Sequence, residues 1–170
     1  MQGGADRPSC KRRPRVPGRR ETPSGTLEWA PLKAPWEKFS LPAAATAYAH
    51  GRSREFVRAA RQIFGPLVER VDAFPEGRHA WLMAEVPSDG SLSSFFRALE
   101  RRLEPAGSLW VVFPKKPFVE ELGFPFLWIE VQKAGLAAGL VDNKIAAFSP
   151  RLTSIRFVIP VARRKRLGSA

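Results

Sequence analysis

Hydrophobic periodicity divides the middle of the chain into alternating strands and helices. A short apolar run at residues 45–49 predicts a first strand. From Ser53 onward, apolar residues recur at helical spacing with arginines on the opposite side, which predicts a helix that Ser53 caps and that the Gly-Pro pair at 65–66 ends. Residues 67–74 form either a second strand or an irregular return.

The next segments give the clearest pattern in the chain. Residues 80–86 are almost continuously apolar, as expected for a strand buried on both faces. Apolar residues at i, i+3, i+4, i+7 and i+11 from Leu92 predict an amphipathic helix, which we expect the Pro-Ala-Gly sequence at 105–107 to end. Residues 109–113 then predict a second buried strand.

The last third of the chain predicts one more helix and a hairpin. Residues 126–138 form the helix, and residues 144–148 and 155–161 form the two strands, with a turn at 142–144. Strands that alternate with helices imply a mostly parallel sheet with right-handed crossovers. The predicted fold class is therefore α/β, a mostly parallel Rossmann-like sheet with a C-terminal antiparallel hairpin.

Charge is concentrated near the two ends of the chain. The net charge is +12, of which residues 1–24 contribute +5 and residues 161–170 contribute +4, so that only +3 remains for the rest. The length of 170 residues suits one domain. We therefore predict a disordered basic tail at 1–25, a single α/β domain at 26–161 and a basic C-terminal tail at 162–170. Two alternatives for the first tail are an over-extended gene start and an arm that contacts nucleic acid phosphates.

Composition also excludes several classes of protein. No apolar run approaches the ~20 residues that a membrane-spanning helix needs. The single cysteine, Cys10, excludes a disulfide framework, and a zinc site is not expected with only His50 and His79 beside it. The paired arginines near the start are not followed by an apolar segment, so no export signal is predicted and the expected location is the cytoplasm.

The second half of the chain resembles a family of uncharacterised bacterial proteins, domain of unknown function 3052. In that family a G-x-h-W-h-x-h-P-K strand precedes an A-G-L helix exit and a final strand. The matching residues here are Gly107, Leu109, Trp110, Val112, Pro114, Lys115, Lys116, Ala138, Gly139, Leu140, Thr153, Ser154, Arg156 and Phe157. The family is similar to a trimmed class I methyltransferase fold, so the resemblance implies a methyltransferase-like domain over about half of the chain.

Enzymes that use adenosylmethionine usually carry a glycine-rich loop after the first strand and an acidic residue after the second. The corresponding loop here runs from His50 to Arg54 with one glycine, and Asp72 is the only acidic candidate. We interpret this as a degenerate site in a protein that is not an enzyme and has no cofactor. The alternative is an adenosylmethionine-dependent methyltransferase with a divergent cofactor loop.

The candidate ligand site lies where predicted parallel strands end. A helix N-terminus beside arginines suits an anion, and lysines at the carboxyl end of a strand suit a carboxylate or phosphate. The candidate residues are His50, Gly51, Arg52, Ser53, Arg54, Asp72, Lys115 and Lys116. The plainer interpretation makes Ser53 only a helix cap and leaves the charged side chains in solvent. Expected partners are a small anionic ligand or a protein, with nucleic acid binding by the basic tails as the alternative.

Overall fold

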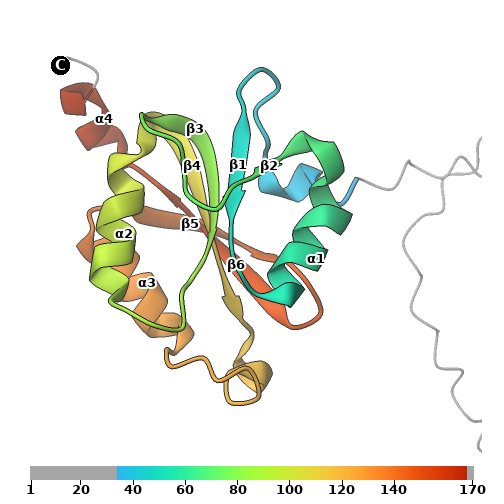
Figure 1. The fold of residues 1–170 in the computed structure, drawn as a ribbon. Coiled ribbons are helices and arrows are strands. Elements are labelled where there is room, and N and C mark those ends of the chain that lie inside the picture. Colours follow the sequence, from blue (N-terminus) through green and yellow to red (C-terminus); the bar gives the residue numbers. More distant parts are fainter. Residues whose placement is uncertain (1–33, 168–170) are drawn as a thin grey trace, which may run out of the picture. The chain divides into compact units, whose positions relative to one another are not determined.

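The computed structural model describes residues 34–167, which form one six-stranded sheet with helices on both faces (Figure 1). The strand order is β2-β1-β3-β4-β6-β5. Strands β1 to β4 pair in parallel, whereas β6 runs antiparallel to both β4 and β5. This arrangement confirms the predicted fold class. The basic tail predicted at residues 1–25 lies outside the described residues.

The sheet and its helices follow the predicted order. The strands are β1 (Ala47–His50), β2 (Glu69–Arg70), β3 (His79–Glu85), β4 (Leu103–Pro114), β5 (Val141–Ala147) and β6 (Leu152–Val158). The α-helices are α1 (Arg54–Phe64), α2 (Leu92–Arg101), α3 (Trp128–Ala137) and α4 (Val161–Leu167). Three short 3-10 helices are η1 (Glu37–Phe39), η2 (Gly65–Leu67) and η3 (Lys116–Phe118). Among these described helices, none is long and apolar enough to span a membrane.

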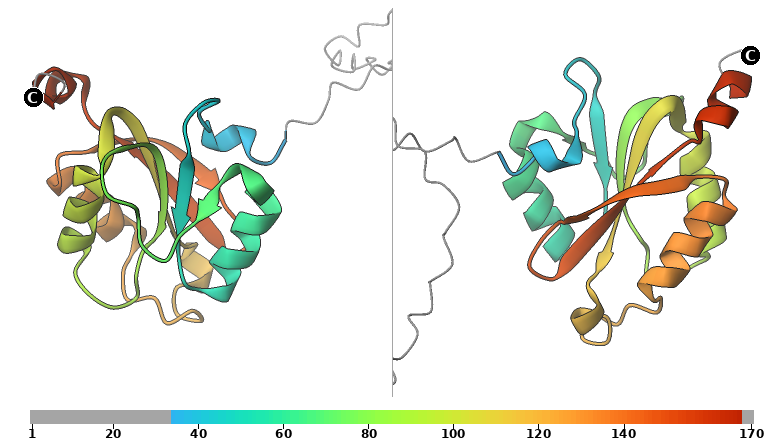
Figure 2. Two further views of the ribbon diagram at one scale, coloured as in Figure 1. Left: turned by 45° about the horizontal axis from the view of Figure 1, so that its top comes forward. Right: turned by 180° about the vertical axis from the view of Figure 1, so that it is seen from behind.

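Helices cover the sheet from two sides (Figure 2). Helix α1 and η1 lie on one face, and α2 and α3 lie on the other. Because successive side chains of a strand point to opposite faces, Trp81 and Met83 pack toward α1 while Leu82 and Ala84 pack toward α2. Central strands that are apolar on both faces are typical of a parallel sheet between helices.

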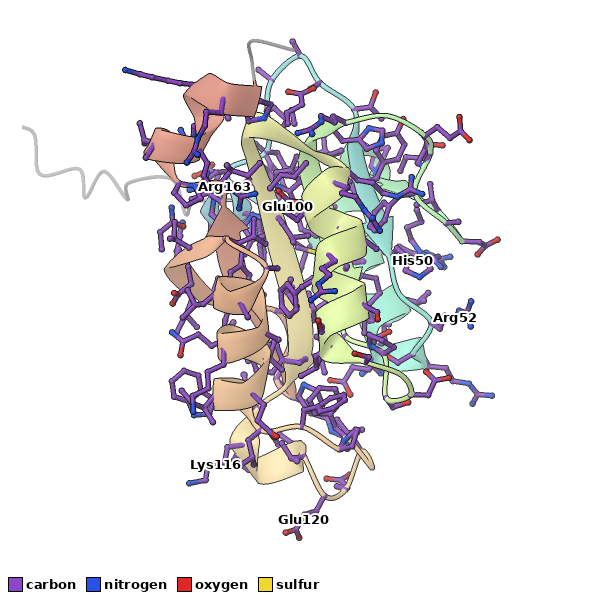
Figure 3. The ribbon with its side chains drawn as sticks, turned by 90° about the vertical axis from the view of Figure 1, so that its left-hand side faces the viewer. His50, Arg52, Glu100, Lys116, Glu120 and Arg163 are labelled. Atoms are coloured by element: carbon purple, nitrogen blue, oxygen red, sulfur yellow. The ribbon has the colours of Figure 1, made fainter. Side chains whose placement is uncertain are left out.

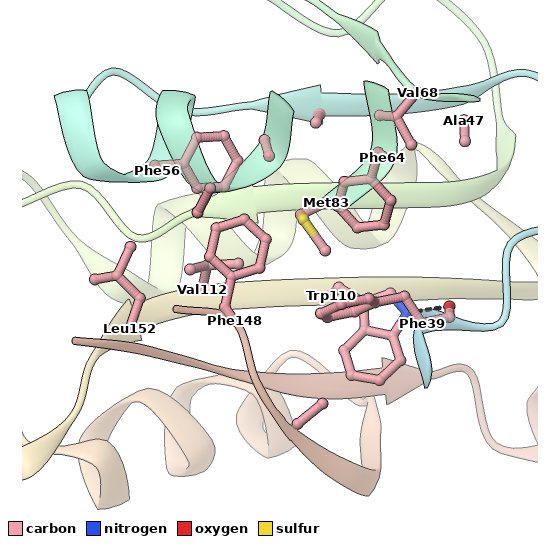
Figure 4. Packing of buried hydrophobic residues seen from close by; sticks show 14 of the residues in the cluster. Phe39, Ala47, Phe56, Phe64, Val68, Met83, Trp110, Val112, Phe148 and Leu152 are labelled. Atoms are coloured by element: carbon pink, nitrogen blue, oxygen red, sulfur yellow. Dashed lines mark hydrogen bonds between the residues drawn. The ribbon is translucent and has the colours of Figure 1, made fainter. Parts of the chain in front are cut away.

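Phe39 packs the segment before β1 against the core. Its ring is fully buried and packs against Phe64, Trp110 and Phe148. Its backbone oxygen accepts hydrogen bonds from the indole N–H groups of Trp81, at 3.0 Å, and Trp110, at 2.9 Å. Figure 4 shows the hydrogen bond from Trp110. This part of the segment before β1 therefore belongs to the core.

Helix α2 ends earlier than predicted. Leu103 begins β4, so the Pro-Ala-Gly sequence at 105–107 lies inside the strand and does not end the helix. The β3–β4 register shifts between His79 and Trp81, where four residues of β4 are left without the regular pairing. A proline is tolerated at such an irregularity because no regular ladder hydrogen bond is lost there.

Residues 142–144 also differ from their prediction. They lie within β5, where the register with β6 shifts between Asp142 and Lys144, and they do not form a turn. Asp142 accepts a hydrogen bond of 2.8 Å from the Gln132 side chain of α3. Polar residues at a strand irregularity resemble a turn in the sequence, because both conformations favour Asp and Asn.

The basic stretch near the C-terminus contains a helix. Helix α4 includes Arg163, whose guanidinium donates to the backbone oxygen of Gly139 and, at 2.9 Å, to Glu100 of α2. Figure 3 shows Arg163 and Glu100 side by side. These contacts connect α4 to both helices on that face of the sheet.

Candidate functional site

The strand order reverses between β1 and β3. The chain leaves β1 through α1 to reach β2 on one side, whereas β3 lies on the other side of β1. In open α/β sheets, ligands bind at such a switch point, outside the carboxyl ends of the strands. A pocket of about 710 Å³ opens there, lined by residues 50–55, 85–89, 114, 122, 124 and 151–152. In Figure 1 the loops that follow β1, β3 and β4 leave the lower edge of the sheet.

The loop between β1 and α1 is built around Ser53 and Gly51. Ser53 is extended and its Oγ accepts from the Phe56 N–H at 3.1 Å, which caps α1 as predicted. A Cβ on Gly51 would lie 2.4 Å from the nearest carbon of the Phe56 ring. The single glycine of this loop is therefore needed for packing over a buried phenylalanine.

Glu85 occupies the amino end of α1. Its Oε2 accepts from the backbone N–H groups of Arg52 and Ser53, both at 2.9 Å, and its Oε1 accepts from the Ser53 hydroxyl. Unpaired amides at a helix N-terminus and the helix dipole favour an anion at this place. Here the chain's own carboxylate is that anion. Two N–H groups of the loop just before α1, those of Arg52 and Ser53, are thus engaged by Glu85.

Glu85 is not among the site residues that the sequence predicts. It is the last residue of β3, and the register places its neighbour Ala84 beside His50, so its side chain reaches the β1–α1 loop. The available signal was an acidic residue at the end of an otherwise apolar strand. Its partner loop lies more than thirty residues away in sequence, so the pairing itself was not visible.

His50 faces the next loop along the sheet. Its Nδ1 lies 3.0 Å from the backbone oxygen of Val71, and its ring lies 5.6 Å from that of Phe74. Because a carbonyl oxygen only accepts, Nδ1 carries the proton, which leaves the lone pair of the neutral ring on Nε2. A second hollow of about 170 Å³ shares His50, Glu85 and Pro87 with the main pocket.

Arg151 lies in the turn between β5 and β6 and connects the segments that form the opposite wall of the pocket. Its guanidinium forms ion pairs with Glu55 of α1, at 3.5 Å, and with Glu121 of the loop before α3. Ser149 of the same turn donates to Glu55 at 2.7 Å. These contacts join the hairpin, α1 and the loop after η3, so three segments distant in sequence form one wall.

The structure brings together only some of the candidate residues. All five residues from His50 to Arg54 line the pocket, but Lys115 and Lys116 do not. The Lys115 ammonium donates to the backbone oxygen of Pro150 at 2.9 Å, and Lys116 is exposed on η3, away from His50 and Arg52 in Figure 3.

Asp72 and Lys115 both lie outside the pocket lining. Asp72 is exposed and lines neither of the two hollows. Burial lowers the pKa of Lys38 below its usual value, and the positive charge of Lys115 lowers that pKa further. Lys115 therefore acts electrostatically on η1, outside the pocket.

The side chains that line the pocket suit adenosylmethionine better than the loop between β1 and α1 does. Apolar side chains such as Val86, Leu122 and Phe124 can cover an aromatic base, and the carboxylates of Glu85 and Asp89 can accept from hydroxyl or ammonium groups. By contrast, the backbone N–H groups of Arg52 and Ser53, just before α1, are engaged by Glu85. A ligand held here would therefore rely on side chains.

Comparison with known proteins identifies the fold. No family model matches the chain, and no curated protein is similar to it. A putative S-adenosylmethionine-dependent methyltransferase from Listeria monocytogenes has a similar structure, with a TM-score of 0.50 and 10% identity over 75% of this chain and 98% of that one. The N-methyltransferase NodS from Bradyrhizobium japonicum gives 0.48 and 9%, covering 74% and 94%. A TehB-like methyltransferase from Corynebacterium glutamicum gives 0.43 and 10%, covering 68% of each chain. The chain therefore has a class I methyltransferase-like fold.

Proposed function

We propose that the pocket between β1 and β3 binds adenosylmethionine and that the protein is a methyltransferase with a divergent cofactor loop. The observation that carries this proposal is the pocket of about 710 Å³ at the switch point of a methyltransferase-like sheet. Pockets of roughly 300–1,000 Å³ are usual for small ligands and cofactors. The fold likeness favours this function over the interpretation that the protein has no cofactor.

The residues that would hold the ligand differ from a glycine-rich loop. Leu122 and Phe124 would cover the base, while Glu85 and Asp89 would accept from ribose hydroxyls or an ammonium group. Adenosylmethionine supplies an electrophilic methyl group when it is bound. His50 lines the same pocket, and the lone pair on its Nε2 can take a proton from a substrate nucleophile.

A second candidate function is a non-catalytic domain that binds a small ligand or a protein partner. Two observations favour it. The backbone N–H groups of Arg52 and Ser53, just before α1, are engaged by Glu85, and Asp72 is exposed outside the pocket. In that case the pocket would bind a ligand without methyl transfer.

Isothermal titration with adenosylmethionine and adenosylhomocysteine tests ligand binding. We expect micromolar affinity in the full chain. Leu122→Asp should weaken binding about tenfold or more by placing a charge on the apolar wall. The matched control is Leu136→Asp, an exposed leucine on α3 outside the pocket lining, which should bind as the wild type does.

Methyl transfer is measured separately. Transfer from labelled adenosylmethionine to a candidate nucleophile supports the enzyme, whereas tight binding without transfer supports the second candidate. Absence of binding for both compounds at millimolar concentration would reject adenosylmethionine as the ligand.

A further inference from the structure

We infer that Glu85 determines the ligand specificity of the switch-point pocket by excluding anionic groups from residues 52–53, the loop just before α1. A ligand group bound at this loop must then be neutral or cationic. The identity of the whole ligand rests on the proposed function, but the exclusion of anions follows from Glu85 alone.

Glu85 accepts hydrogen bonds from the loop just before α1. A helix N-terminus ordinarily receives a phosphate or carboxylate through its free N–H groups. In this chain, one oxygen of Glu85 accepts from the Arg52 and Ser53 amides at 2.9 Å, and the other accepts from the Ser53 hydroxyl. Both carboxylate oxygens are thus committed to this loop, so an external anion finds no free donor among these three groups.

The strand that carries Glu85 lies inside the sheet and is held on both sides. Its Cα pairs with Val112 in the β3–β4 register, and the next residue, Val86, donates to the Val112 oxygen at 2.9 Å. Val86 is also buried, with 4% of its surface exposed. The backbone of Glu85 is held in place because it belongs to a central strand. Its carboxylate can therefore leave the loop only if the side chain changes its rotamer and three hydrogen bonds break.

A ligand group that enters this part of the pocket lies beside the negative charge of Glu85. A phosphate at this place would contact a carboxylate of like charge, and this repulsion is stronger in a pocket than in bulk water. An ammonium or sulfonium group would instead be attracted to the same carboxylate. Arg52 and Arg54 are exposed, so solvent screens their compensating charge.

The test compares phosphate binding in the wild type and in Glu85→Gln. Glutamine keeps the shape of the side chain but removes its negative charge. The amide resonances of Arg52 and Ser53 are followed by nuclear magnetic resonance during titration with inorganic phosphate. We expect no saturable shift of these resonances in the wild type. In Glu85→Gln we expect the affinity for phosphate to be about tenfold higher or more, because hydrogen bonds from the loop to a charged phosphate are stronger than those to a neutral amide.

The control is Glu69→Gln, which makes the same change at an exposed glutamate of β2 outside the pocket lining. It should leave the Arg52 and Ser53 amides unresponsive to phosphate. A saturable shift in the wild type, or no gain in Glu85→Gln, would overturn the inference. Dispersion of the amide spectrum reports folding, and Glu85→Ala provides the same comparison if the glutamine variant does not fold.

Adenosine compounds separate this inference from the proposed function. We expect methylthioadenosine, which is neutral, to bind the wild type more tightly than adenosine monophosphate, and Glu85→Gln to reduce that preference about tenfold. If no adenosine compound binds either protein, the proposed function fails and the phosphate titration still decides the role of Glu85. An unchanged preference in Glu85→Gln would contradict the inference while leaving the proposed function intact.

Discussion

At the scale of single residues, two indole N–H groups converge on one carbonyl oxygen. Trp81 and Trp110 are both fully buried, and each would leave a buried donor unpaired without the oxygen of Phe39. An unpaired buried donor costs about 1–3 kcal/mol, so this shared acceptor is a substantial contribution to stability. The contact also explains why a segment rich in proline docks on the sheet.

Trp110→Ala should lower the free energy of unfolding by about 3–5 kcal/mol, because a buried aromatic is replaced by a cavity. Denaturant titration measures this loss. Trp110→Phe, which keeps most of the volume but removes the hydrogen bond to Phe39, should be milder. A loss below about 1 kcal/mol for the alanine variant would contradict the buried position of Trp110.

At the scale of elements, α3 approaches the sheet closely through Gly135. A Cβ at this position would lie 2.4 Å from the nearest ring carbon of Phe157, which is itself fully buried in β6. The helix therefore packs against the strand at a distance that only glycine permits.

Gly135→Ala should destabilise the protein by about 1–3 kcal/mol, because overpacking against a buried ring outweighs the gain in helix propensity of about 1 kcal/mol. The free energy of unfolding is again the measurement. Lys133→Ala, at an exposed position of the same helix, serves as the control and should change it by less than ~0.5 kcal/mol. Equal stability of Gly135→Ala and the wild type would show that α3 can shift away from β6.

Helix α4 depends on a different kind of contact. Arg163 donates to the Gly139 oxygen and to Glu100, whereas Arg166 on the same helix is exposed. Arg163→Ala should therefore accelerate amide hydrogen exchange throughout residues 161–167, while exchange in the sheet stays as in the wild type. Arg166→Ala is the matched control, and faster exchange in both variants would show that general charge, and not the Arg163 contacts, holds the helix.

At the scale of the whole molecule, most of the net positive charge lies near the ends of the sequence, and the pocket lies at one edge of the sheet. The pocket lining contains both arginines and carboxylates, so it does not by itself favour a polyanion. We therefore expect any nucleic acid binding to depend on the terminal segments and to be separable from the ligand site.

Deletion of residues 1–25 should change the melting temperature by no more than about 1 °C, because their composition offers little apolar surface to bury. If these residues contact phosphates, the same deletion should weaken the binding of labelled DNA or RNA and flatten its salt dependence. Anisotropy titrations at several salt concentrations measure this effect. A melting point several degrees lower would show that the segment packs on the domain.

Part of the candidate site followed from topology alone. A strand that ends at His50 in a parallel sheet must deliver the next loop to the carboxyl edge, and the structure places residues 50–54 there. The same reasoning was insufficient for Lys115 and Lys116. After Pro114 the chain turns into η3, and Lys115 extends to the Pro150 oxygen, so a position just past a strand end did not bring either lysine into the pocket.

The sequence by itself determined the alternation of strands and helices, since period-3.6 stripes and continuous apolar runs are local consequences of burial on one or two faces. It also determined that Ser53 caps α1, because a cap involves residues three positions apart. Only the tertiary structure decided that Glu85 fills the amino end of α1, that Phe39 receives two indoles and that Arg151 joins the pocket wall. These contacts join residues tens of positions apart, and they depend on strand register and crossover geometry, which no local pattern encodes.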